Sequence, residues 1–483
     1  MKFRDLHGGA SGHKGWLASG MLLFSSLLSA EVITSYVLYG QNTSGDATPM
    51  ARVIVDGVDQ SCPALLSAHG SPITTHARIN PDPAHFPITV CEALYPFDQA
   101  LQVANSQVTL PVVDKKIKTV AVFGDTGCKP SHQDCSAQSS NWPFPGLIKA
   151  AAGKDPDVVL HMGDYNYSGT PGTITINGVG PVSVYDAGDN TTQGMCRIPG
   201  ARYGQNSAGS QQPDSWVHWQ ADFFSAAQPL FSLSPWIFAR GNHELCSRAG
   251  PGWFYLLDPN SALLGQYQQQ LNCPSADNPT PDVLSAPYVI DLSGLNVAVL
   301  DSANACDAGS LFVNSYENQL ALMNQLIRNA GQDEATWVQT HRPLWGVDQL
   351  DDNGNCGSDP GKYCMINQTL QRAMNSQPLD ATVRLIMSGH MHRFQVADFK
   401  SAKHPDQFVI GNSGVRLSGM HPKTTQKLII DGHQATVMGL DQFGFMAFSL
   451  QKHNQWQGEV LDSQSNALLT CDSEHKPICT KPD

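Results

Sequence analysis

Residues 158–167 read VVLHMGDYNY, an apolar run that passes through a glycine into Asp164 and Tyr167. An apolar run of this length that ends in a turn is typical of a buried strand, and the glycine lets the chain turn sharply where the strand ends. Four other stretches also run from apolar residues into a polar cluster, and all but WVQTHRP pass through a glycine. They are TVAVFGDTG at 119–127, WIFARGNHE at 236–244, WVQTHRP at 337–343 and VRLIMSGHMH at 383–392. The alternation of such runs with helical segments predicts a layered α/β domain.

The polar side chains that follow these runs are expected to lie together. Carboxyl ends of neighbouring strands meet along one edge of a sheet, so residues far apart in the sequence converge there. The side chains comprise carboxylates, an amide, imidazoles and a phenol without any cysteine, which is a ligand set for hard or borderline metal ions. Each motif alone is more often an ordinary turn, so the prediction of a metal site depends on the ordered set of five. Its candidate ligands are Asp125, Asp164, Tyr167, Asn242, His341, His390 and His392.

The ordered motifs GDTG, GDYNY, GNHE, VQTH and GHMH resemble those of the purple acid phosphatase branch of the calcineurin-like metallophosphoesterases. The resemblance spans most of the chain after its N-terminal segment. It implies a metallophosphoesterase fold, with two packed mixed β-sheets flanked by helices and preceded by a small β-rich module. It also implies a hydrolase that cleaves phosphate ester bonds with a dinuclear metal centre.

The resemblance also implies how the ligands divide between two metals. Asp164 would bridge both ions, and the first motif often has a histidine where this chain has Gly127, so Tyr167 would serve as the alternative ligand. The first site would contain Asp125, Asp164, Tyr167 and His392, and the second Asp164, Asn242, His341 and His390. A phenolate with carboxylates makes a hard, anionic site. The resemblance therefore implies Fe(III) in the first site and Fe(II), Zn(II) or Mn(II) in the second.

The implied reaction is in-line attack on phosphorus by a metal-bound hydroxide. Asp164 and His243 would be catalytic, with His243 facing the substrate and helping to protonate the leaving group. Asn242, His243 and Arg342 would contact the substrate, although a salt bridge at the strand end is an equal alternative for Arg342. The expected substrate is a small phosphomonoester, as for an acid phosphatase. Alternatives are a phosphodiesterase for nucleotides or phospholipid head groups and, disfavoured because every ligand position is filled, a secreted binding protein with an inactive site.

The N-terminal segment is typical of an export signal, because the basic residues Lys2 and Arg4 precede the apolar run Leu17–Ala30. A cleaved signal predicts a secreted protein, periplasmic or extracellular, without a stable membrane span; an uncleaved anchor that extends through Val32–Tyr39 is the alternative. The expected organisation is a signal over 1–30, a linker over 31–49, a β-rich module over 50–112, the catalytic domain over 113–470 and a tail over 471–483.

Twelve cysteines, an even number, predict disulfide bonds in an exported chain. A zinc site is disfavoured because the chain has no CxxC pair. Short spacing within polar, glycine- and proline-containing segments favours four pairs and leaves Cys196, Cys246, Cys273 and Cys306 open. The four pairs are Cys62–Cys91, Cys128–Cys135, Cys356–Cys364 and Cys471–Cys479.

The remaining patterns exclude some functions and predict several local elements. A formal charge of −13 without long basic runs disfavours a nucleic-acid scaffold, and no nucleophile elbow, HExxH motif or Walker A loop is present.

We expect one helix over Asp214–Phe231, with Asp214-Ser215 as its cap, and another over Ser315–Ala330. Segments 168–213 and 246–285 are expected to be long loops, and Gly411–Gly414 a turn beside the metal edge.

Overall fold

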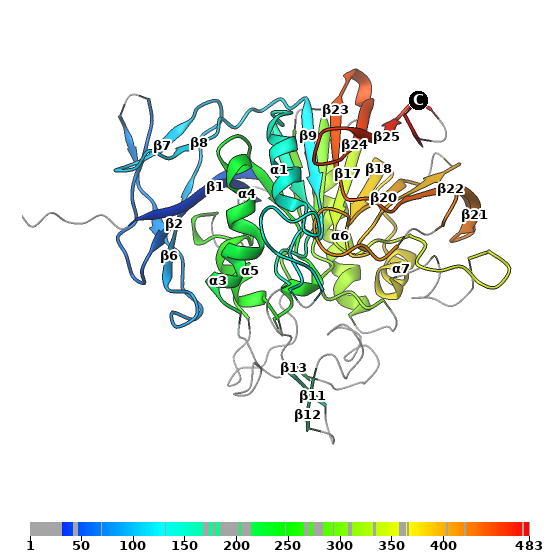
Figure 1. The fold of residues 1–483 in the computed structure, drawn as a ribbon, viewed down its shortest axis with the longest axis horizontal. Helices are drawn as coiled ribbons and strands as arrows, with labels where there is room; N and C mark the ends of the chain where they lie inside the picture. Colours follow the sequence, from blue (N-terminus) through cyan, green and yellow to red (C-terminus); the bar gives the residue numbers. More distant parts are fainter. Residues whose placement is uncertain are drawn as a thin grey trace, which may run out of the picture.

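The computed structural model describes most of the chain after residue 30 (Figure 1). The expected signal over 1–30, Cys196 and large parts of the segments 168–213 and 246–285 lie outside the described residues. The described ranges are 31–41, 47–68, 70–130, 132–167, 173–176, 180–183, 202–203, 214–246, 248–264, 270–273, 284–292, 294–307, 312–331, 335–356, 364, 367–401, 404–419, 422–475 and 478–482.

The larger of two main sheets has eleven strands around a parallel centre. This centre consists of β9 (Thr119–Phe123), β10 (Val158–His161) and β14 (Trp236–Phe238), which pair in parallel in that order. On one side the sheet continues with β1 (Val32–Gln41), β2 (Ala47–Asp56), β6 (Ile88–Leu94) and β5 (His76–Ala77). On the other side it continues with β23 (Phe445–Leu450), β24 (Trp456–Leu461), β25 (Ala467–Asp472) and β26 (Cys479–Thr480).

The second main sheet has eight strands and also has a parallel centre. Its parallel strands are β16 (Leu295–Leu300), β17 (Ala335–Thr340), β18 (Val383–Ser388) and β20 (Asp406–Ile410). Antiparallel strands complete the sheet: β15 (Tyr288–Asp291), β19 (Phe394–Phe399), β22 (His433–Leu440) and β21 (Gln426–Ile430).

Two small sheets lie outside the main pair. One contains β3 (Leu65–Leu66), β4 (Pro72–Ile73), β7 (Leu101–Val103) and β8 (Thr109–Leu110). The other contains β11 (Thr173–Ile176), β12 (Gly180–Ser183) and β13 (Arg202–Tyr203).

Alternating side chains on the strands create three apolar layers. Val120 and Val122 of β9 face the second sheet and share one cluster with Trp337 and Met387, whereas Ala121 and Phe123 belong to the cluster on the opposite face. That outer face is covered by α1 (Phe144–Ala152), α3 (Trp216–Trp219), a π-helical turn (Gln220–Phe224), α4 (Ser225–Phe231) and α5 (Gly250–Leu256). The second sheet is covered by α6 (Val313–Ala330) and α7 (Gln368–Ser376). The predicted fold class, two packed mixed sheets flanked by helices, is confirmed.

The expected linker over 31–49 is wrong. Residues Val32–Gln41 form β1, which pairs in parallel with β14 and antiparallel with β2 over most of its length. The β-rich N-terminal strands β2, β6 and β5 therefore extend the main sheet. The expected tail over 471–483 likewise contains β26, which pairs with β25. Val32–Tyr39 is an apolar stretch that was also weighed as part of a membrane anchor, and its pairing with β2 and β14 shows that it is a strand. Strand β26 has only two residues, which give little local signal.

Both predicted helical segments are helical, and Ser215 occupies the expected N-cap position of the first. Helix α3 begins after Ser215, whose side chain makes no capping hydrogen bond. The Asp214 carboxylate instead accepts hydrogen bonds from Nε1 of Trp219 at 2.9 Å and from the backbone N–H of Gly252 at 2.6 Å. Asp214 thus joins this helical segment to α5.

All four predicted disulfides are present, and Cys246–Cys273 is a fifth. Cys306 is also disulfide-bonded. In the part of the chain that the structure describes, no helix is both long and apolar enough to cross a membrane.

Candidate metal centre

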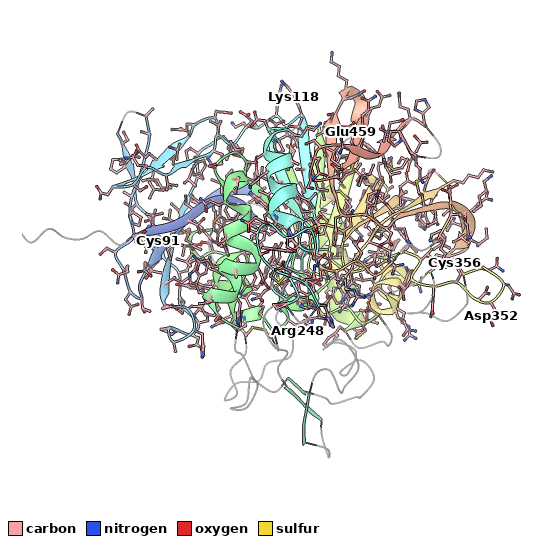
Figure 2. The ribbon with its side chains drawn as sticks, in the orientation of Figure 1. Cys91, Lys118, Arg248, Asp352, Cys356 and Glu459 are labelled. Atoms are coloured by element: carbon pink, nitrogen blue, oxygen red, sulfur yellow. A yellow bond between two sulfur atoms is a disulfide. The ribbon has the colours of Figure 1, made fainter. Side chains whose placement is uncertain are left out.

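The five polar loops lie at one edge of the two main sheets. Strand β9 leads to Asp125, β10 to Asp164 and Tyr167, β14 to Asn242, β17 to His341, and β18 to His390 and His392. Figure 2 shows Lys118, just before β9, near the top of the view and Arg248, beyond β14, near the bottom of the main body, above the small sheet β11–β13. The carboxyl ends of the parallel strands therefore point toward the same side.

A first group of side chains gathers around the hydroxyl of Tyr167. This hydroxyl lies 3.0 Å from Oδ2 of Asp164, 3.2 Å from Oδ1 of Asp125 and 3.1 Å from Nε2 of His392. One potential ligand atom from each of Asp125, Asp164 and His392 lies within 4.8 Å of the others. These are the four residues expected for the first metal.

A second group shares Asp164 with the first. Nε2 of His341 lies 3.3 Å from Oδ2 of Asp164 and 3.0 Å from Oδ1 of Asn242. Nδ1 of His390 lies 2.8 Å from the same Asn242 oxygen. Potential ligand atoms of Asp164, His341 and His390 again lie within 4.8 Å of one another. The structure thus brings all seven predicted residues together in two groups that meet at Asp164.

Four of these residues have a left-handed backbone: φ is 55° at Asp125, 61° at Asp164, 72° at His390 and 46° at His392. Such conformations cost on the order of 1–3 kcal/mol each outside glycine and persist where the surrounding structure enforces them. Hydrogen bonds do so here, because the N–H of His390 donates to Oδ2 of Asp125 and the N–H of His243 donates to Oδ1 of Asp164, both at 2.8 Å. Each carboxylate therefore has one oxygen held by the backbone and another directed at the cluster.

The charge balance of the cluster fits bound cations. Burial and the neighbouring Asp164 raise the pKa of the Asp125 carboxyl well above its usual range. Burial, Asp164 and Asp125 raise the pKa of the Tyr167 phenol in the same way. Burial lowers the pKa of His392 to about 3 and also lowers that of His390. Neutral imidazoles beside crowded acidic groups are a donor set that positive ions would stabilise.

Hydrogen bonds behind the imidazoles decide which nitrogen faces the cluster. Nδ1 of His341 lies 2.8 Å from the carbonyl oxygen of Met162, so it carries the proton and Nε2 is free to act as a ligand. Nε2 of His390 lies 3.2 Å from Oδ2 of Asp307, which leaves Nδ1 for the cluster. Partners of this kind fix the orientation and basicity of metal-binding histidines.

Arg342 takes part in the same arrangement. Its guanidinium is fully buried, forms a 2.5 Å ion pair with Asp307 and lies 3.1 Å from Nε2 of His390. The salt bridge that was weighed against a substrate contact for Arg342 is therefore present. The substrate contact itself stays a prediction.

His243 lies on the open side of the cluster. Its side chain is partly exposed and its ring packs against that of Tyr167, with 3.8 Å between the ring centroids. Burial and Arg248 lower its pKa well below the usual range, which favours the neutral imidazole. The backbone bond from His243 to Asp164 ties its position to the residue that both groups share.

Two buried acidic residues were missed by the sequence analysis. The first is Glu244, whose carboxylate accepts hydrogen bonds from the N–H groups of Gly241, Asp164, Tyr165 and Asn166 at 2.9–3.2 Å, and so shapes the loop that contains Asp164.

The second missed residue is Asp307, which follows β16. The apolar run of this strand, Leu295–Leu300, is also followed by a polar stretch, DSANACD. The sequence pattern that identified the other five motifs, an apolar run followed by polar residues, could therefore also have identified this sixth segment.

The predicted turn at Gly411–Gly414 does lie beside the cluster. A Cβ atom on Gly411 would lie 2.9 Å from Oδ2 of Asp125, and the N–H of Val415 donates to the carbonyl oxygen of Asp125 at 2.8 Å. The turn therefore supports the loop that follows β9.

Comparisons with known proteins place this architecture among phosphoesterases. A family model described as calcineurin-like phosphoesterase matches residues 118–394. A purple acid phosphatase from yellow lupin (Lupinus luteus) seeds has a similar fold, with 14% sequence identity and a TM-score of 0.53 over 91% of this chain and 74% of that one. A structure of PhoD is 12% identical, with a TM-score of 0.49 over 94% of this chain and 92% of the other. No curated protein sequence matches the chain significantly.

Proposed function

Since this chain belongs to the calcineurin-like phosphoesterase family and is a phosphate ester hydrolase, we propose that it is an exported phosphatase of the purple acid type. Its substrates are small phosphomonoesters, and its active centre contains two metal ions. The five described disulfides support export, because such bonds persist in oxidising compartments.

The observation that carries the proposal is the position of Oδ2 of Asp164. This atom lies 3.0 Å from the Tyr167 hydroxyl and 3.3 Å from Nε2 of His341, so one carboxylate oxygen borders both groups of side chains. Asp125, Tyr167 and His392 would hold the first ion, and Asn242, His341 and His390 the second, with Asp164 between them. Such a pair of ions supplies an activated water and offsets charge on the phosphoryl group.

The two groups differ in their chemistry, which bears on the identity of the metals. The first offers a phenol, two carboxylates and one imidazole, whereas the second offers one carboxylate, an amide oxygen and two imidazoles. Hard, anionic ligands favour a trivalent ion. We therefore assign Fe(III) to the first group and Fe(II), Zn(II) or Mn(II) to the second.

His243 is the proposed contact to the leaving-group oxygen. The imidazole of His243 is partly exposed beside Tyr167, and the backbone N–H of His243 donates to Oδ1 of Asp164, so the residue is positioned relative to the shared carboxylate. A neutral imidazole can donate one N–H to the departing oxygen. This hydrogen bond would offset the negative charge that develops on the departing oxygen.

Metal analysis combined with a phosphate-release assay tests the proposal. The purified protein should contain about two metal ions and hydrolyse p-nitrophenyl phosphate faster than bis(p-nitrophenyl) phosphate, and chelation should abolish the activity. His390→Ala should lose most activity and one metal equivalent, whereas a matched change at the exposed His475 should lose neither. Full activity and metal content in His390→Ala would contradict the two-metal assignment, and a preference for the diester would contradict the monoester assignment.

A further inference from the structure

Three cationic side chains border the candidate metal centre, and we call Lys129, Arg248 and Arg416 the basic rim. Lys129 lies in the loop that begins with Asp125, Arg248 in the loop that begins with Asn242, and Arg416 in the loop after β20. All three loops leave the carboxyl ends of strands at the edge where the ligand candidates gather. Neither the sequence motifs nor the family resemblance includes any of these three residues.

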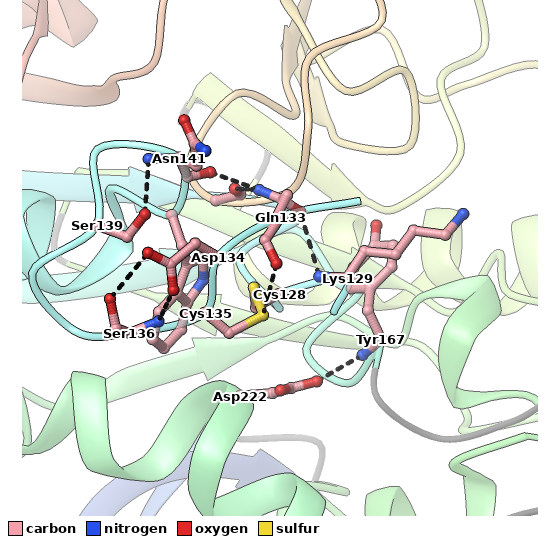
Figure 3. Close-up of a disulfide and its surroundings, with 12 residues drawn as sticks. Cys128, Lys129, Gln133, Asp134, Cys135, Ser136, Ser139, Asn141, Tyr167 and Asp222 are labelled. Atoms are coloured by element: carbon pink, nitrogen blue, oxygen red, sulfur yellow. Dashed lines mark hydrogen bonds between the residues drawn. A yellow bond between two sulfur atoms is a disulfide. The ribbon is translucent and has the colours of Figure 1, made fainter. Parts of the chain in front are cut away.

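Hydrogen bonds join the loops that carry Lys129 and Arg416. Oε1 of Gln133 accepts from the N–H of Lys129 at 3.2 Å, while Nε2 of Gln133 donates to the carbonyl oxygen of Gly414 at 2.9 Å. The Cys128–Cys135 disulfide closes the Lys129 loop, and in Figure 3 the Lys129 side chain extends past Tyr167. Gly127 of the same loop lies against the Tyr167 ring. The loop that carries Lys129 therefore also contacts the first ligand group.

The three charges act on one another and on the metal centre. Burial lowers the pKa of the Lys129 ammonium, and the positive charges of Arg248 and Arg416 lower it further. Arg248 and Lys129 both lower the pKa of His243, and Lys129 also lowers that of His392. These directions agree with the geometry, because the loops after β9, β14 and β20 place the rim at the same sheet edge as the partly exposed His243.

Lys129 and Arg416 have no counter-ion within the part of the chain that the structure describes. Three arginines closer to the sheets are paired instead: Arg240 with Asp301, Arg342 with Asp307 and Arg393 with Asp348. Unpaired lysines on an open surface are common, but Lys129 is half-buried and lies near two like charges. Like charges that are brought together without a counter-ion repel one another, and an anion placed between them removes that cost.

We propose that the basic rim is a subsite for a second anionic group of the substrate. The preferred substrates are then small phosphomonoesters that carry another phosphate or a carboxylate, such as sugar bisphosphates. The reacting phosphoryl group lies at the two ligand groups, and the second anion lies between Lys129 and Arg416. This inference rests on the proposed function, because it assigns a substrate class to the same centre.

Matched substrates and matched variants test the subsite by kinetics. The ratio of kcat/KM for fructose 1,6-bisphosphate to that for fructose 6-phosphate should fall about 100-fold or more in Lys129→Gln/Arg416→Gln, because two hydrogen bonds to a charged group are lost and each weakens binding by about tenfold or more. Lys400→Gln/Lys427→Gln is the control, since both lysines are exposed and lie on the second sheet away from the rim. Arg248 stays unchanged because it is buried and has further contacts. A ratio that falls equally in both double variants, or in neither, overturns the subsite.

Calorimetry separates failure of the subsite from failure of the proposed reaction. Propane-1,3-bisphosphonate should bind the metal-loaded protein at least tenfold more tightly than propylphosphonate, and the preference should disappear in Lys129→Gln/Arg416→Gln and weaken with added salt. Absence of hydrolysis with any substrate, together with this preference, would contradict the phosphatase assignment and leave the subsite standing. Equal binding of the two phosphonates by the unmodified protein would overturn the subsite whatever the enzyme hydrolyses.

Discussion

Gly127 lies directly against the ring of Tyr167, so that a Cβ atom on Gly127 would be only 2.6 Å from Cδ2 of the tyrosine. Real Cβ atoms do not approach another carbon so closely, and a side chain at 127 therefore excludes the tyrosine from its present position. Gly127 is the place where related phosphoesterases often carry a histidine. Tyr167 can therefore occupy its position in the first ligand group only because residue 127 is a glycine.

Gly127→Ala tests this dependence. The added methyl group should displace the Tyr167 ring, because it would also meet the backbone carbonyl group of Tyr165 and could not move aside. We expect loss of the metal in the first site and a decrease of about 1–3 kcal/mol in the free energy of unfolding, which is typical of overpacking. Metal analysis and chemical denaturation measure the two effects. Gly153→Ala at the end of α1 is the control, and unchanged metal content in Gly127→Ala would refute the steric argument.

Tyr167→Phe tests the phenol as a ligand. The Tyr167 hydroxyl lies within 3.2 Å of Asp164, Asp125 and His392, so a phenolate there would give a visible charge-transfer band with Fe(III). The band should disappear in Tyr167→Phe and persist in Tyr165→Phe, since the Tyr165 hydroxyl bonds to the carbonyl oxygen of Ala239. Visible absorption spectra of the purified proteins decide the outcome. A band that survives in Tyr167→Phe would remove this residue from the first site.

Asp307→Asn tests the support behind His390. The substitution removes the negative charge that pairs with Arg342 and accepts from His390, so His390 should bind its metal less tightly. Losses of partners of this kind usually weaken metal binding by about 10- to 100-fold. Titration of the metal-depleted protein with Zn(II) measures the effect at the second site. Asp348→Asn is the control, because the Asp348 side chain is largely exposed although it also pairs with an arginine, Arg393. Equal zinc affinity in the two variants would mean that Asp307 does not support the site.

His404 predicts a pH dependence of stability that is independent of the metal centre. Its ring packs against Phe399, Trp345 and His433, and burial lowers its pKa to about 4. Between pH 4 and the ordinary histidine pKa of about 6.5, the unfolded chain binds the proton more readily, so this group's contribution to stability is full above that range and is lost as the pH falls through it.

The free energy of unfolding should therefore fall less steeply from pH 6.5 to 4 in His404→Phe than in the unmodified protein. Denaturant titrations at several pH values measure the slope, and His132→Phe is the control because His132 is exposed. Identical slopes in the unmodified protein and His404→Phe would contradict the burial effect.

Local patterns in the sequence were sufficient for the features that depend on neighbouring residues. Each apolar run followed by a glycine and a polar cluster became a strand with its side chains at the expected edge, as β10 and Asp164 show. Four of the disulfides were also predictable: the cysteines of three pairs are separated by only seven or eight residues, and those of the fourth by 29. Spacing alone was not sufficient, because Cys246–Cys273, with a similar separation of 27 residues, was left open.

Contacts between distant parts of the chain were decided only by the tertiary structure. The pairing of β1 with β14, the bonds from Asp214 to Trp219 and Gly252, and the Asp307–Arg342 ion pair depend on how the layers pack. The same holds for the link that Gln133 makes between the loop of Lys129 and the turn at Gly414, two residues before Arg416. Residue types and spacing specify which side chains are available at the strand ends. The tertiary structure decides which of these side chains come into contact and which charges have no partner in the described chain. Such contacts depend on loop closure and burial between residues that are hundreds of positions apart, and they leave no periodic signal in the sequence.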